Sequence, residues 1–199
     1  MNPPDIGLFS LFVASIFTSN ILLSNFLGMC SFIAISKDLK SANGLGLAVT
    51  VVLTVTGSLN WVILHYVLFP LDLIYLRFII FIIVIAAMVQ VLEMIIDRLS
   101  QKLYITLGIF LPLITVNCAI LGVSLFIEIR DYSFVQTVIY SLGSGLGWWL
   151  AIVALAAIRN KTEKSKTVPA GLQGSGLTMI TIGLMAMAFI GFQGVLSVQ

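Results

Sequence analysis

Residues 41–71 read SANGLGLAVTVVLTVTGSLNWVILHYVLFPL, a run without a single Asp, Glu, Lys or Arg. A helix needs about 20 apolar residues to cross the hydrocarbon core of a bilayer, so this segment is long enough to span a membrane. The rest of the chain is similarly apolar, because 60% of its 199 residues are hydrophobic and only 9% are charged. Soluble domains carry about 25% charged residues. The sequence therefore predicts an integral membrane protein.

Charged clusters divide the chain into six apolar runs, which predict an all-α polytopic membrane protein with six transmembrane helices in one membrane domain, residues 1–199. The third run is short, and it is long enough to span only if Arg77 lies at one interface and Glu93 sits inside the far end. The expected spans are residues 6–36, 41–71, 78–92, 103–127, 132–158 and 167–199.

The basic residues are shared unequally between the expected loops, and this bias predicts the orientation. Cytoplasmic loops carry an excess of Lys and Arg, so the first, third and fifth loops are expected to be cytoplasmic and both termini to lie outside. The odd loops hold Lys37, Lys40, Arg98, Lys102, Arg159, Lys161, Lys164 and Lys166, whereas the even loops hold Arg77 and Arg130.

A net charge of +2 with one His leaves no broad basic face for nucleic acid.

The six spans form two sets of three, at about residues 6–97 and 102–196, and these sets show a weak internal repeat. Each set has one cysteine in its first span, Cys30 or Cys118, followed by a small residue and by a Ser six positions on. An odd number of spans per set means that the two copies enter the membrane from opposite sides. Such inverted repeats commonly build sites near the middle of the bilayer.

The first span of each set is expected to be broken. Pro112 lacks an N–H, and in a continuous helix its ring would clash with the carbonyl of Gly108. Backbone groups freed at membrane depth must face protein or a site, because lipid cannot satisfy them. Straight helices would keep Cys30 and Cys118 apart, whereas broken helices allow a shared site. The residues that interrupt the first span are Asn20, Ser24, Asn25 and Gly28.

Six motifs add a resemblance: FLGMC at 26–30, QVLEM at 90–94, LGIFLPLITVNCAI at 107–120, RDYSF at 130–134, GSGLGW at 143–148 and VPAGL at 168–172. Together they resemble the NqrDE/RnfAE family, the membrane subunits of the sodium-translocating NADH:quinone oxidoreductase (Nqr) and of the Rnf complex. The resemblance covers nearly the whole chain. Residues 130–134 and 192–195 favour the Nqr branch, although residues 65–75 are shorter than in many members.

The resemblance implies a role in electron transfer in the bacterial inner membrane. In this family the D and E subunits are paralogues inserted in opposite orientations, and each supplies two cysteines to one intramembrane [2Fe–2S] cluster. Cys30 and Cys118 match those positions, with Gly28 and Asn117 in the cluster surroundings. The cluster needs four thiolates, so a chain with two cysteines would share it with the D paralogue. NADH, FAD, FMN and quinone would be handled by the remaining Nqr subunits.

Two alternatives stay open: the A subunit of an Rnf ferredoxin:NAD oxidoreductase, and a stand-alone secondary transporter, since transporters share inverted repeats with broken helices. Buried cysteines are often only small apolar residues, and a disulfide is not expected in a site assembled in the cytoplasm. Glu93, an ionisable group inside a span, is a candidate for an ion pathway with sodium as the cargo.

No constellation for acid–base or nucleophilic catalysis occurs in the sequence, so the chain is expected to be one subunit of an enzyme without a complete active site of its own. The motif Gly143-x-Gly145-x-Gly147 follows no strand and lies inside an apolar span, which argues against a nucleotide-binding loop. Glycines at this spacing instead predict close packing between helices.

Overall fold

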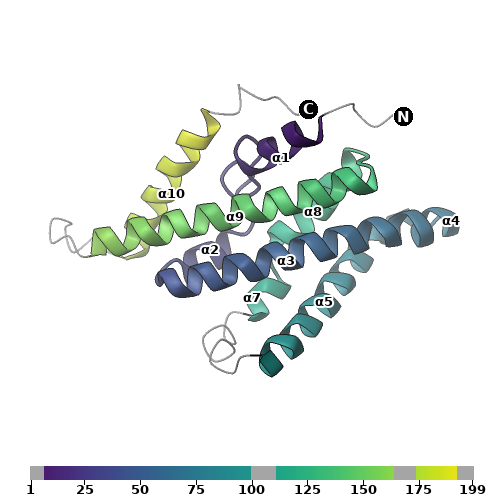
Figure 1. Ribbon diagram of the computed structural model, residues 1–199, viewed down its shortest axis with the longest axis horizontal. Coiled ribbons are helices and arrows are strands. Elements are labelled where there is room, and N and C mark those ends of the chain that lie inside the picture. Colours follow the sequence, from purple (N-terminus) through teal and green to yellow (C-terminus); the bar gives the residue numbers. More distant parts are fainter. Residues whose placement is uncertain (1–6, 100–110, 164–173, 192–199) are drawn as a thin grey trace.

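The computed structural model describes residues 7–99, 111–163 and 174–191, and every regular element within these ranges is helical (Figure 1). The all-α class predicted from the sequence is confirmed. The elements are α1 (Leu8–Ile16), α2 (Met29–Ile35), α3 (Leu39–Ile63), a π-helical turn η1 (Leu64–Leu68), α4 (Phe69–Leu71), a 3₁₀ turn η2 (Ile74–Leu76), α5 (Arg77–Leu99), α7 (Leu111–Thr115), α8 (Cys118–Ile129), α9 (Phe134–Glu163) and α10 (Ser175–Ile190).

Three helical stretches among the described residues are long and apolar enough to cross a membrane: Leu39–Leu71, Ile74–Ile95 and Phe134–Thr162. They coincide with the second, third and fifth expected spans. Two shorter apolar helices, Leu113–Ile129 and Ser175–Ile190, fall within the fourth and sixth. The first expected span is divided into α1 and α2. Six crossings in an inverted arrangement stay a prediction.

Helices α3 and α9 run antiparallel and form the centre of the structure (Figure 1). Glycines allow their close approach, because a Cβ atom on Gly46 would lie 2.1 Å from the ring of Trp149. A Cβ atom on Gly145 would likewise lie 2.8 Å from the Cα atom of Thr50. Small residues have this role in many membrane helix pairs, and the packing interpretation of the glycine motif at 143–147 is confirmed.

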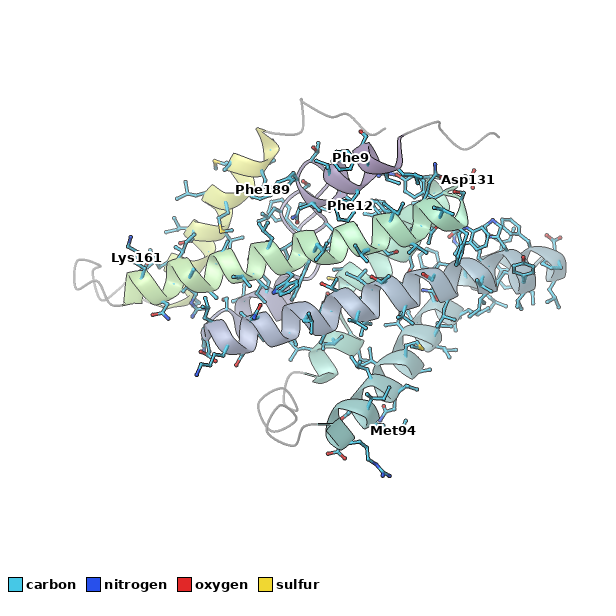
Figure 2. The ribbon with its side chains drawn as sticks, in the orientation of Figure 1. Phe9, Phe12, Met94, Asp131, Lys161 and Phe189 are labelled. Atoms are coloured by element: carbon cyan, nitrogen blue, oxygen red, sulfur yellow. The ribbon has the colours of Figure 1, made fainter. Side chains whose placement is uncertain are left out.

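The two ends of the bundle are tied by different contacts, and Figure 2 shows Asp131 and Lys161 at opposite ends. At one end Arg77 forms an ion pair with Glu128, joining the expected second and fourth loops. At the other end Arg159 donates to the Ser36 hydroxyl, joining the end of α9 to the end of α2. Even loops therefore meet even loops and odd loops meet odd, as the expected topology requires. Which end faces the cytoplasm stays a prediction.

Candidate cofactor site at two helix breaks

The first break separates α1 from α2, and a buried amide satisfies much of its backbone. Asn20 has no exposed surface. Its Nδ2 donates to the carbonyl oxygens of Ile16 at 2.9 Å and Gly147 at 3.0 Å. Its Oδ1 accepts from the backbone N–H groups of Leu22 at 3.1 Å and Leu23 at 3.3 Å. Groups freed at membrane depth are thus paired within the protein, as the absence of water in lipid demands.

The end of this break takes the left-handed conformation. Phe26 has φ 55° and Gly28, the N-cap residue of α2, has φ 85°. Only glycine visits this region routinely. A Cβ atom on Gly28 would lie 2.9 Å from Asn117 Oδ1 and 2.9 Å from Trp148 Nε1. Both the backbone angle and the close approach of Asn117 and Trp148 therefore require glycine at position 28.

The second break is shorter and lies between α7 and α8. Asn117 is the N-cap of α8, and its Oδ1 accepts from the backbone N–H of Ala119 at 3.0 Å. Its Nδ2 reaches the hydroxyl of Ser31 on α2 at 3.4 Å. The expected discontinuity is confirmed, but it follows α7, which contains Pro112. The expected effect of Pro112 on Gly108 lies outside the described residues.

The two breaks meet at a sulfur atom. The backbone N–H of Gly28 donates to Cys118 Sγ at 2.9 Å. Cys118 is the first residue of α8, and Cys30 is the second residue of α2, two positions after Gly28. Both cysteines are free and exposed. The structure therefore brings three predicted site residues, Gly28, Asn117 and Cys118, into direct contact, with Cys30 in the adjoining turn.

The donor set at this position suits one half of an iron–sulfur centre. Both thiols are exposed, and a backbone N–H already points at one sulfur, the kind of hydrogen bond that tunes iron–sulfur potentials. Among the described residues, no three His, Cys, Asp or Glu side chains gather closely enough to hold a metal ion. Two thiols here can therefore ligate a four-thiolate cluster only together with ligands from elsewhere.

Glu93, the predicted ion-pathway residue, lies apart from this contact. It is half-buried within α5, a helix that packs against α7 and α8. Among the described residues, no hydrogen bond or ion pair joins Glu93 to either break. Its role in ion movement stays a prediction.

The sequence did not predict the positions of two buried residues. Trp148 is fully buried behind Gly28, and its Nε1 has no hydrogen-bond partner within the described structure. Arg159 was expected to follow a span ending at Ile158, but the helix itself does not end there. Arg159 lies inside α9, which continues to Glu163, and is only 9% exposed. The glycine motif at 143–147, which directly precedes Trp148 and predicts close helix packing, was the one sequence feature that could have indicated its burial.

Comparison with known proteins identifies the family. A family profile described as "Rnf-Nqr subunit, membrane protein" matches residues 8–196. The chain belongs to the Rnf-Nqr family. The resemblance predicted from the sequence motifs is thereby confirmed.

Several relatives of this Rnf-Nqr protein are named as the E subunit of the Na(+)-translocating NADH-quinone reductase. The protein of Chlamydia muridarum (strain MoPn / Nigg) is 52% identical over 96% of this chain and 82% of its own length. That of Chlamydia trachomatis serovar L2 is 51% identical over the same shares. That of Chlamydia caviae is 50% identical over 96% of this chain and 76% of its own length.

Proposed function

We propose that this chain is the E subunit of a sodium-translocating NADH:quinone oxidoreductase, acting in electron transfer coupled to sodium export. The name shared by relatives about half identical to it supports this assignment. The contact between Gly28 N–H and Cys118 Sγ carries the structural argument, because it joins the two cysteine-bearing breaks in one place.

In this proposal Cys30 and Cys118 supply two of the four thiolates of a [2Fe–2S] cluster. The D paralogue, which has the opposite orientation, supplies the other two. When bound, such a cluster transfers single electrons. Gly28 holds the Cys118 sulfur through its N–H, and Asn117 fixes the first turn of α8. Because α8 begins at Cys118, the positive end of its dipole would stabilise an anionic cluster held by that residue.

In this proposal, other subunits handle NADH, FAD, FMN and quinone and carry out the remaining parts of the reaction. The chain crosses the bacterial inner membrane six times, with both termini outside. Sodium movement is coupled to rearrangement of the two breaks, with Glu93 as a candidate for the ion pathway. Support for this topology comes from the contacts at the bundle ends, where Arg77 meets Glu128 and Arg159 meets Ser36.

Replacing each cysteine in the assembled complex tests the proposal. We expect Cys30→Ser and Cys118→Ser each to remove the cluster, with loss of its iron and labile sulfide, of its paramagnetic signal and of quinone reduction. The double variant should lose no more than either single one, because ligands of one cluster act as a unit. Val116→Ala is the matched control, since Val116 is an exposed neighbour of Cys118 without a ligating atom.

Two results would decide against parts of this proposal. If both Ser variants assemble and retain iron, the cysteines are not ligands, and a transporter role becomes the better explanation. If the intact complex exchanges electrons between ferredoxin and NAD but does not reduce quinone, the chain is the A subunit of an Rnf complex. The family description, which covers both Rnf and Nqr, keeps this second candidate open.

A further inference from the structure

A cavity of about 590 Å³ opens at the end of the bundle where α2 and α9 end and α10 begins. Figure 1 shows the start of α10 beside the end of α9. The residues that line the cavity are Ile33, Ala34, Lys37, Arg159, Gly174 and Ser175. None of them belongs to the proposed cluster site, so this cavity needs a separate explanation.

Two cationic side chains line the cavity from different elements. Arg159 Nη1 donates to Ser36 Oγ at 2.9 Å and to the carbonyl oxygen of Ile33 at 3.3 Å, and these bonds fix the guanidinium in the wall. Lys37 follows Ser36, the residue that caps the end of α2, and it is exposed. The acidic residue nearest to Lys37 in the sequence is Asp38. Its carboxylate accepts from the backbone N–H and hydroxyl of Ser41, and so caps α3.

The start of α10 adds a third positive feature to the same cavity. No side chain caps its first turn, and that turn contains no acidic residue. A helix start of this kind presents backbone N–H groups and a partial positive charge. Gly174 and Ser175, which form this start, both line the cavity and are exposed. Three chain segments therefore direct positive charge into one space.

The other part of the wall is apolar, which narrows the class of ligand. Ile33 and Ala34 line the cavity next to the cationic groups, and a smaller cavity adjoining Arg159 and Gly174 is lined by Leu177. Basic pockets between membrane helices suit anionic lipid headgroups. We infer that this cavity binds the phosphate of an anionic phospholipid, with the lipid chains along Ile33 and Ala34. This inference does not depend on the proposed electron-transfer role.

Photo-crosslinking beside the cavity tests this inference in the assembled complex. The probe replaces Gly176 with p-benzoylphenylalanine, because a side chain there meets nothing within 4 Å. The complex is placed in phosphatidylcholine vesicles containing a minor share of phosphatidylglycerol. We expect adducts with phosphatidylglycerol in excess of its share, reduced about fivefold by Lys37→Gln, since each basic residue near a membrane surface contributes on this scale.

Two further variants separate lipid binding from folding. Lys40→Gln removes the same charge from an exposed residue that does not line the cavity, and it should leave the adducts unchanged. Ser175→Asp places an acid in the first turn of α10, which stabilises a helix start but repels phosphate. We expect it to preserve assembly and reduce the adducts.

Three outcomes would overturn the inference. The first is labelling of the two lipids in proportion to their shares in the vesicle, or labelling that neither Lys37→Gln nor Ser175→Asp changes. The second is suppression of the adducts by added inorganic phosphate, which would make this a site for the free anion. The third is an adduct with another polypeptide of the complex, which would make the cavity an interface between subunits.

Discussion

The two helix breaks both use a buried asparagine, yet they depend on different surroundings. Asn20 in the first break bonds to backbone groups on both sides of it and to Gly147 on α9. Asn117 in the second break caps its own helix and reaches Ser31 on α2. The first break is therefore shaped by α9, whereas the second is placed against the first. Damage to the first break should spread to both cysteines, and damage to the second should remain local.

Gly28→Ala should have the largest effect, because this residue belongs to the first break and contacts the second. The new methyl group would lie 2.9 Å from Asn117 Oδ1 and from Trp148 Nε1, on a backbone with φ 85°. Overpacking and the left-handed backbone together should lower the free energy of unfolding by about 2–4 kcal/mol. Unfolding of the purified chain in detergent, with iron content of the assembled complex, measures this.

Gly183→Ala is the matched control, because a Cβ atom at Gly183 in α10 would meet nothing within 4 Å. It should leave stability and iron content unchanged or slightly raise stability, since alanine favours a helix interior over glycine. If Gly28→Ala behaves like this control, the two breaks do not meet at Gly28 as the structure shows.

Replacing the two asparagines in parallel tests the difference between the breaks directly. Asn20→Ala leaves the N–H groups of Leu22 and Leu23 without their acceptor in a buried region, which should lower the free energy of unfolding by about 2–3 kcal/mol. Asn117→Ala removes a helix cap, an effect of about 1 kcal/mol. Denaturant titration of both variants under one condition gives the comparison.

Asn117→Ser separates capping from the contact with Ser31, because serine also caps helices well. We expect it to recover most of the stability that Asn117→Ala loses. Equal destabilisation by Asn20→Ala and Asn117→Ala would contradict the dependence of the second break on the first.

The long helices and the existence of both breaks could be predicted from the sequence, because apolar length and interrupting residues are local properties. The position of the second break was harder to predict from the sequence. Pro112 was the strongest local signal, yet it lies within α7 and the break falls at Asn117. An asparagine breaks a helix only where its side chain finds backbone partners, and those partners depend on tertiary packing.

Arg159 and Trp148 show what local patterns leave out. Arg159 follows an apolar run and is itself followed by polar residues, so sequence alone places it in a loop. The structure buries it because the end of α2 supplies acceptors at Ile33 and Ser36. Trp148 lies behind Gly28, a residue 120 positions earlier in the chain. Such long-range pairs follow from how α9 packs, and no periodicity in one helix reveals them.

Phe26→Gly should produce the smallest change in stability, and its direction tests whether strain in the first break serves assembly. Phe26 has φ 55° with half of its side chain exposed, an unusual conformation for a bulky residue. Glycine relieves this strain, so the purified chain should become more stable by up to about 1 kcal/mol. If the exposed ring packs against the partner beside Cys30, the same variant should lower the yield of assembled, iron-containing complex.

Asp72→Gly is the matched control, because Asp72 has φ 54° but lies in the turn after α4. A stabilised Phe26→Gly chain that still assembles fully, like the control, would show that the strained ring has no role at the interface.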